Sequence, residues 1–203
     1  MPTDANGAAR SERPPTHPQL RRIHDEFERA RERLRRLADG GDARWNARPH
    51  PAHWSAAECV AHLNLASEAY LQVIDDGLAR AEPLPAGSQR RYRLGPVGWL
   101  LVRTMAPPVR LRTRTSAPFV PSATVDRLAA VETFERLQDE QIRRVARAEG
   151  YAIDRVRVAS SFDARVRYDL YACLCILPRH QERHLWQAER ALGVGDERGR
   201  GAP

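Results

Sequence analysis

The sequence predicts an all-α protein, a four-helix bundle with a long crossover between helices two and three. Four long segments repeat apolar residues at spacings of three and four, the period of an amphipathic helix. No segment shows sustained strand-like alternation, so the helices must bury their apolar faces against one another. The 203 residues fit one domain, which we place at 16–192, between disordered tails at 1–15 and 193–203.

The first predicted helix begins at Thr16 and ends before Gly40. Thr16, Pro18 and Gln19 have the residue types of a capping box with proline in the first turn. Apolar residues then follow at helical spacing: Leu20, Ile23, Phe27, Ala30, Leu34 and Leu37. Gly40 and Gly41 stop the run. We expect this helix to bury one continuous apolar stripe.

The second predicted helix begins after Ser55 and ends near Gly77. Ser55 can cap the helix and Glu58 can reach back to it, which is the reciprocal pattern of a capping box. Trp54 lies in the position of a hydrophobic staple and can pack onto Cys59. These signals make the start of this helix the best defined in the chain.

The third and fourth predicted helices cover residues 122–150 and 161–192. The buried face of helix three is predicted to be Leu128, Val131, Phe134, Leu137, Ile142 and Val145. In helix four, Pro178 predicts a kink or a restart. Segment 151–158 alternates briefly, but we interpret it as an extended linker because a lone strand has no partner.

The crossover at residues 78–121 is too long for a tight turn and carries the charge excess of the chain. It can return to the end where helix two starts and still hold a short helix at 95–105, so helices two and three can run parallel. Residues 83–121 contain no acid and seven arginines: Arg90, Arg91, Arg93, Arg103, Arg110, Arg112 and Arg114. The rest of the chain balances 26 arginines with 26 acidic residues, so the net charge of +7 is local.

Three histidines are the candidate metal ligands. His180 and His184 lie four residues apart in helix four, so both imidazoles can face one point. His62 lies two turns into helix two, on the face that carries Cys59 and Ala66. An isolated pair of this kind is more often solvent-facing, and a lone inward histidine more often bonds a carbonyl. Together the three can share an ion and leave coordination positions open, as in a catalytic site.

Other ligand assignments fit the spacing less well. The stretch H-Q-E-R-H lacks the glutamate that directly follows the first histidine of a zinc peptidase, because Glu182 comes one position later. Cys59 is a conceivable ligand, but the staple with Trp54 accounts for it. The remaining histidines lie near predicted helix ends or in a loop, and we expect them at the surface: His17, His24, His50 and His53.

In the order of its motifs the chain resembles the DinB-like superfamily of metalloenzymes, which includes DNA-damage-inducible and YfiT-like proteins. These motifs are the W-S start of helix two followed by H-L, the approach RTSAPFVPS to helix three, and the terminal H-x-x-x-H followed by W-Q. The resemblance covers residues 16–192. It implies a four-helix bundle in which His62, His180 and His184 hold a divalent ion such as Zn²⁺ or Ni²⁺. Relatives include thiol S-transferases that use bacillithiol or mycothiol, a mycothiol-dependent isomerase and hydrolase-like members.

We therefore expect a metal-dependent enzyme that activates a thiol or water for transfer or hydrolysis on a small anionic substrate, with a low-molecular-weight thiol as a further cofactor. Residues 83–121 are expected to cover the open end of the bundle beside the histidines, with an arginine directed at the anion. The alternative is a bundle without catalytic activity, which binds metal for structure or meets nucleic acid or a partner through its basic segment.

Expectations about location and partners follow from composition. The longest strongly apolar run, 99–102, is too short to span a membrane and the first residues lack a signal sequence, so we expect a cytoplasmic protein with no membrane partner. Nucleic acid is disfavoured, because only Tyr92, Trp99 and Phe119 interrupt the arginines and no helix-turn-helix is present. The remaining partner is a second copy of the chain, as a homodimer.

Overall fold

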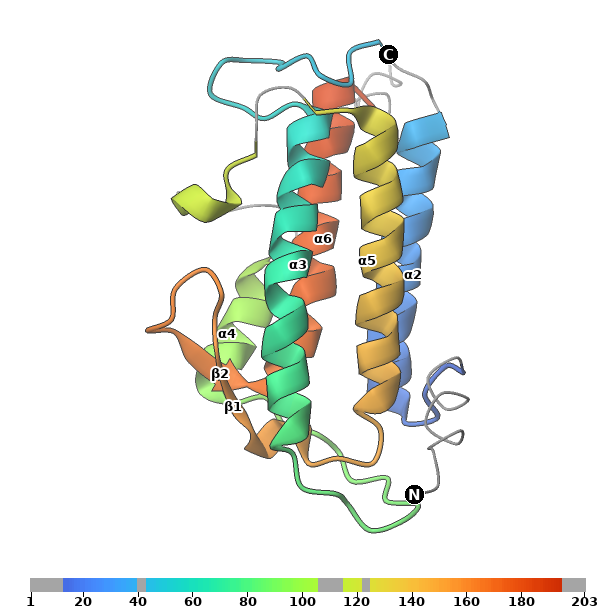
Figure 1. Ribbon diagram of the computed structural model, residues 1–203, viewed down its shortest axis with the longest axis vertical. Helices are drawn as coiled ribbons and strands as arrows, with labels where there is room; N and C mark the ends of the chain where they lie inside the picture. The colour runs from blue at the N-terminus through green and yellow to red at the C-terminus, as the bar shows by residue number, and fades with distance from the viewer. Residues whose placement is uncertain (1–12, 40–42, 106–114, 122–124, 195–203) are drawn as a thin grey trace, which may run out of the picture.

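The computed structural model describes residues 13–39, 43–105, 115–121 and 125–194, and these are mostly helical (Figure 1). The four long helices are α2 (Pro18–Asp39), α3 (Ala56–Ala79), α5 (Arg127–Arg147) and α6 (Leu170–Leu192). Helices α2 and α3 each pack against both α5 and α6. Figure 1 shows that α3 and α5 run in the same direction, opposite to α2 and α6, as the long crossover predicts. The all-α prediction is confirmed apart from a two-stranded sheet.

Helix α2 buries the predicted stripe completely. All six of its apolar residues are buried: Leu20, Ile23, Phe27, Ala30, Leu34 and Leu37. At the start of α3, the Ser55 hydroxyl accepts from the Glu58 amide at 3.1 Å, and the Glu58 carboxylate accepts from the Ser55 amide at 2.9 Å. The predicted capping box is thus confirmed, because local spacing alone determines these features.

A buried polar layer separates two apolar clusters along α5 and α6. In α5, Gln138 and Gln141 follow Phe134 of one cluster and precede Val145 of the other. In α6, the layer lies between Leu177 and Leu185. Its members there are His180, Gln181 and His184, all buried. Buried polar side chains need hydrogen-bond or ligand partners, so this layer is a candidate functional site.

The prediction of an extended linker at 151–158 is wrong. This segment contains the short 3₁₀ helix η2 (Ile153–Arg155) and the start of strand β1 (Arg157–Ala159). Strand β1 pairs antiparallel with β2 (Arg167–Asp169), with Val158 opposite Tyr168. The missing partner strand lies in residues that the sequence pattern had assigned to helix four.

Helices α5 and α6 begin later than predicted, at Arg127 and Leu170. Helix α6 begins only at Leu170, where the Asp169 carboxylate caps it, and it continues through Pro178 without a restart. Leu128 of α5 was predicted to be buried but is 72% exposed. It lies two residues before the buried Ala130, hence on the opposite side of the helix.

The start of α2 packs against the crossover, which overturns a prediction for His17. His17 was expected at the surface, yet it is buried, with its ring centroid 4.7 Å from that of Tyr92. Its Nε2 lies 3.2 Å from the carbonyl oxygen of Arg90. The Arg90 guanidinium in turn pairs with Asp154. The crossover therefore folds back over the N-terminal end of α2, and local sequence patterns do not reveal this contact.

Several expectations concern residues outside the described ranges. They are the stop at Gly40 and Gly41, three of the crossover arginines (Arg110, Arg112 and Arg114), and most of the tails at 1–15 and 193–203. Among the helices that are described, none is long and apolar enough to cross a membrane.

The predicted short helix of the crossover is α4 (Pro96–Met105), which packs against α6 through Gly98. A Cβ atom built on Gly98 would lie 2.4 Å from the Cβ of Ala172, closer than two carbon atoms can approach. We therefore expect Gly98→Ala to lower the free energy of unfolding by about 1–3 kcal/mol, the range for overpacking. Urea unfolding measures this change in the free energy of unfolding. Adding Ala172→Gly removes the clashing methyl, so the two changes together should cost less than their sum; strict additivity would contradict this contact.

Candidate metal centre

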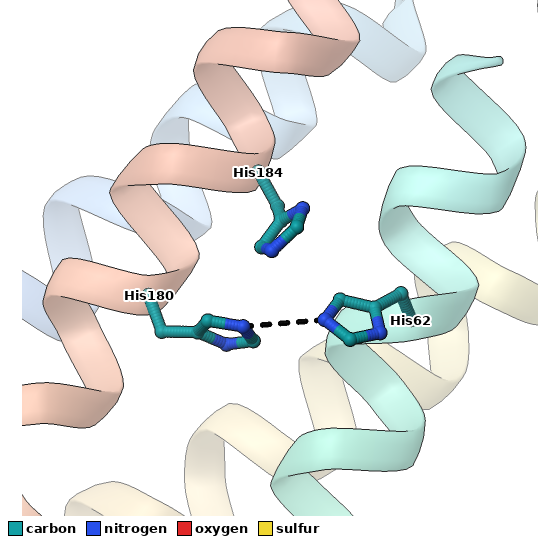
Figure 2. Close-up of side chains that lie close together, drawn as sticks. All are labelled: His62, His180 and His184. Atoms are coloured by element: carbon teal, nitrogen blue, oxygen red, sulfur yellow. Dashed lines mark hydrogen bonds between the residues drawn. The ribbon is translucent and has the colours of Figure 1, made fainter. Parts of the chain in front are cut away.

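Three buried histidines converge between α3 and α6 (Figure 2). His62 comes from α3, and His180 and His184 come from successive turns of α6. Their side chains are only 2%, 6% and 7% exposed. Each offers one ring nitrogen, and these three atoms all lie within 4.8 Å of one another. The structure thus brings together the three histidines that the sequence singles out.

The hydrogen bonds of His62 determine which nitrogen it can offer to an ion. Its Nδ1 lies 2.8 Å from the carbonyl oxygen of Phe119, so Nδ1 must carry the proton that it donates. The lone pair is then on Nε2, which lies 3.2 Å from Nε2 of His180. This contact has the length of a hydrogen bond, and it is also close to the separation of about 3.3 Å between two imidazole ligands of one tetrahedral zinc ion.

His184 completes the group. Its ring centroid lies 4.4 Å from that of His62 and 4.6 Å from that of His180. In Figure 2 the ring nitrogen of His184 that faces His62 and His180 is the one remote from Cγ, Nε2. One nitrogen of each ring can therefore face the same point, and neutral imidazole nitrogens are ligands that zinc and related divalent ions accept. The residues present therefore fit a divalent metal ion.

The environment keeps all three imidazoles neutral at pH 7. Burial lowers the pKa of His62, His180 and His184. The positive charge of Arg183, which lies on α6 between Glu182 and His184, lowers each of them further. Only a neutral imidazole has a lone pair to donate, so the site is ready to bind a cation without first losing protons.

Aromatic side chains surround the histidines. The ring of Trp54 lies 4.9 Å from that of His62, and the ring of Phe162 lies 5.5 Å from that of His180. The ring of Phe119, whose carbonyl binds His62, lies 4.3 Å from that of Phe162 at an angle of 49°. Sequence reasoning assigned Trp54 to a staple and Phe162 to a helix, so it missed them as walls of the site. The proximity of Phe119 was signalled only by its place in the motif RTSAPFVPS.

The crossover reaches the histidines through the 3₁₀ helix η1 (Ala117–Phe119), which packs against α3, and not through an arginine of the described part. The prediction of an inward arginine is wrong for Arg90, which pairs with Asp154 beside the start of α2, at the opposite end of the helices. Arg103 lies over Trp99 on α4. The cation near the histidines is instead Arg183, whose pKa is lowered by its burial.

Cys59 does not belong to this group. It is buried one turn before His62, and burial raises the pKa of its thiol to about 12, which keeps it protonated. Within the described ranges, the cluster able to hold an ion consists of histidines alone. An all-imidazole site with three ligands from the protein is typical of catalytic zinc sites, whereas structural sites close with four.

One family model matches most of the chain. The family model described as the DinB superfamily matches residues 26–188. The match extends from α2 into α6 and includes all three histidines. No curated protein and no solved structure matches the chain.

Proposed function

The chain belongs to the DinB superfamily, and from this premise we propose that it is a divalent-metal-dependent enzyme built on a four-helix bundle. His62, His180 and His184 hold the ion, with Zn²⁺ and Ni²⁺ as the candidates. The observation that supports the proposal is the convergence of three neutral, buried imidazoles from two helices, with their ligand atoms within 4.8 Å.

A divalent ion bound by three imidazoles supplies a Lewis acid that lowers the pKa of a coordinated water or thiol. The Phe119 carbonyl holds the His62 ring in one tautomer and one orientation, as outer hydrogen bonds do in metal sites. Trp54 and Phe162 line the histidines with apolar surface and exclude bulk water.

The substrate is a small molecule with an anionic group. The low exposure of the three histidines favours a small reactant. Arg183 contributes a positive charge at the histidines, which favours a carboxylate or another anion on the thiol or on its acceptor. We propose transfer or hydrolysis with a small thiol or water as the nucleophile.

Cobalt substitution distinguishes a catalytic site from a structural one. Metal-free protein is loaded with Co²⁺ and titrated with N-acetylcysteine, a small anionic thiol. An exchangeable coordination position predicts a new near-ultraviolet absorption and a change in the visible bands as the thiol binds. If neither the thiol nor azide alters the spectrum of the loaded protein, the ion has no open position and the enzymatic proposal fails.

Acid is expected to destabilise the metal-free protein below about pH 6.5, the pKa of histidine in an unfolded chain. The pKa values of the three histidines are lowered in the fold, so in acid the unfolded chain binds protons that the folded chain does not. The free energy of unfolding then falls by up to about 1.4 kcal/mol per pH unit for each histidine, and above pH 6.5 this contribution is constant.

Thermal unfolding of chelator-treated protein between about pH 8 and about pH 5 measures this dependence. His180→Gln should reduce the slope by up to about 1.4 kcal/mol per pH unit, the contribution of one proton. Equal slopes for the wild type and His180→Gln would show that His180 is not held neutral by the fold.

A further inference from the structure

Helix α4 exposes apolar residues on the side that faces away from the protein. Its inner side packs on the core through Gly98, Leu101, Val102 and Met105. The outer side of a helix covered on one face normally carries polar residues. In α4 it carries Trp99 and Leu100, each 54% exposed, next to the exposed Val97. This is the densest group of large exposed apolar side chains in the described chain.

Exposed arginines lie before α4, in its last turn and on the neighbouring hairpin. Arg91 and Arg93 precede α4, and Arg103 lies in its last turn, with its guanidinium 5.8 Å from the Trp99 ring. Strand β2 packs against α4, and the hairpin beside α4 in Figure 1 adds Arg157 and Arg167, both exposed. The result is an apolar centre with a positive rim.

The nearby acids do not cancel this charge. Asp154 pairs with Arg90, and Asp163 pairs with Arg165 at the tip of the hairpin. Asp169 is buried and accepts hydrogen bonds from the amides of Gly95 and Ala172. The segment 83–121 has no acid of its own. The exposed arginines beside α4 outnumber these acids, which leaves an excess of positive charge around the apolar centre.

We propose that Val97, Trp99 and Leu100, with Arg91, Arg93 and Arg103, form a surface that binds an anionic lipid bilayer. We call it the α4 face. Trp99 and Leu100 enter the headgroup region, and the arginines contact the lipid phosphates and carboxylates. This is peripheral attachment without a spanning segment, and it revises the expectation that no membrane is a partner. It is independent of the metal site.

The composition of the α4 face favours a lipid surface over two other occupants. Single-stranded nucleic acid is held by aromatic platforms, and the aliphatic Val97 and Leu100 offer no ring on which a base can stack. In a two-fold dimer this face would meet its own copy, and arginines would oppose arginines without an acid between them. A bilayer rich in anionic lipid complements both the apolar centre and the positive rim.

The test is co-sedimentation of the full metal-loaded chain with vesicles. We expect binding to phosphatidylcholine vesicles that contain about 30 mol % phosphatidylserine, and little binding to phosphatidylcholine alone. Each arginine near an anionic membrane is worth about fivefold in partitioning, so Arg91→Gln, Arg93→Gln and Arg103→Gln together should weaken binding about a hundredfold. Binding should also fall as salt rises above about 0.1 M.

A second variant tests the apolar centre. Trp99→Gln with Leu100→Gln should weaken binding at least tenfold, because interfacial burial of apolar side chains is then lost. The matched control for charge is Arg36→Gln, Arg136→Gln and Arg143→Gln, three exposed arginines on α2 and α5. The control for an exposed apolar side chain is Leu128→Gln. The controls should bind as the wild type does, and circular dichroism and metal content should be unchanged in all variants.

Other outcomes overturn the proposal. No sedimentation with anionic vesicles at low salt would exclude a lipid partner. An equal loss of vesicle binding in the α4-face variants and in the controls would show that overall charge, and not this face, attracts the vesicles. Binding of single-stranded DNA but not vesicles, or a dimer in sedimentation equilibrium that Trp99→Gln with Leu100→Gln dissociates, would assign the face to another occupant.

Discussion

Replacing His180 by alanine is expected to lower the affinity of the protein for Zn²⁺ by more than about a hundredfold, because loss of a residue that merely orients a ligand already costs 10–100-fold. His180 lies close to both other members of the group, since its Nε2 lies 3.2 Å from that of His62 and its ring centroid lies 4.6 Å from that of His184. Competition with a chromogenic chelator measures the affinity, and elemental analysis measures the metal content of the purified protein.

Two matched variants make this result specific. His62→Ala removes the contribution of the other helix and should reduce affinity to a similar extent. His50→Ala removes an exposed histidine and should bind zinc as the wild type does. An unchanged affinity in both His180→Ala and His62→Ala would mean that the three histidines do not bind the ion.

The second large effect concerns the buried glutamine pair beside the histidines. The Gln138 amide nitrogen donates to the Gln181 oxygen at 3.1 Å, and the Gln181 amide nitrogen donates to the Gln138 oxygen at 2.7 Å. Gln138→Leu leaves the side-chain NH₂ and the side-chain carbonyl of Gln181 buried without these hydrogen-bond partners. At about 1–3 kcal/mol for each group, we expect the free energy of unfolding to fall by about 2–6 kcal/mol.

The double replacement is the decisive comparison. Gln138→Leu with Gln181→Leu removes both partners, and an apolar pair of similar size should recover most of the lost stability. Denaturant unfolding of the two single variants and the double variant gives the coupling energy directly. A double variant as unstable as the sum of the singles would show that the hydrogen bonds of this pair are not the cause.

The features that were predicted correctly are those that depend on neighbouring residues. The stripe of α2 follows from spacings of three and four, and the cap of α3 follows from Ser55 and Glu58 three positions apart. The faces of His62, His180 and His184 follow from the same periodicity. Their meeting across α3 and α6 depends on how the helices pack, which the family resemblance implied and the periodicity alone did not.

The features that were missed depend on contacts between distant residues. Strand β1 exists because it pairs with β2, and the Tyr168 hydroxyl of β2 bonds the Tyr70 hydroxyl of α3 at 2.8 Å. The crossover contains seven arginines and no acid of its own, but Arg90 pairs with Asp154, which lies 64 residues later. Counting charges along a chain cannot show which of them are already neutralised in space.

Extended X-ray absorption fine structure of the metal-loaded protein, measured at the absorption edge of the metal, tests most directly whether three histidines bind the ion. Our account predicts three imidazole nitrogens per ion at about 2.0–2.1 Å, a lighter ligand such as water in the remaining position, and no sulfur. Scattering from sulfur at about 2.3 Å, which would point to a cysteine such as Cys59, or fewer than two imidazoles per ion, would contradict a site built from His62, His180 and His184.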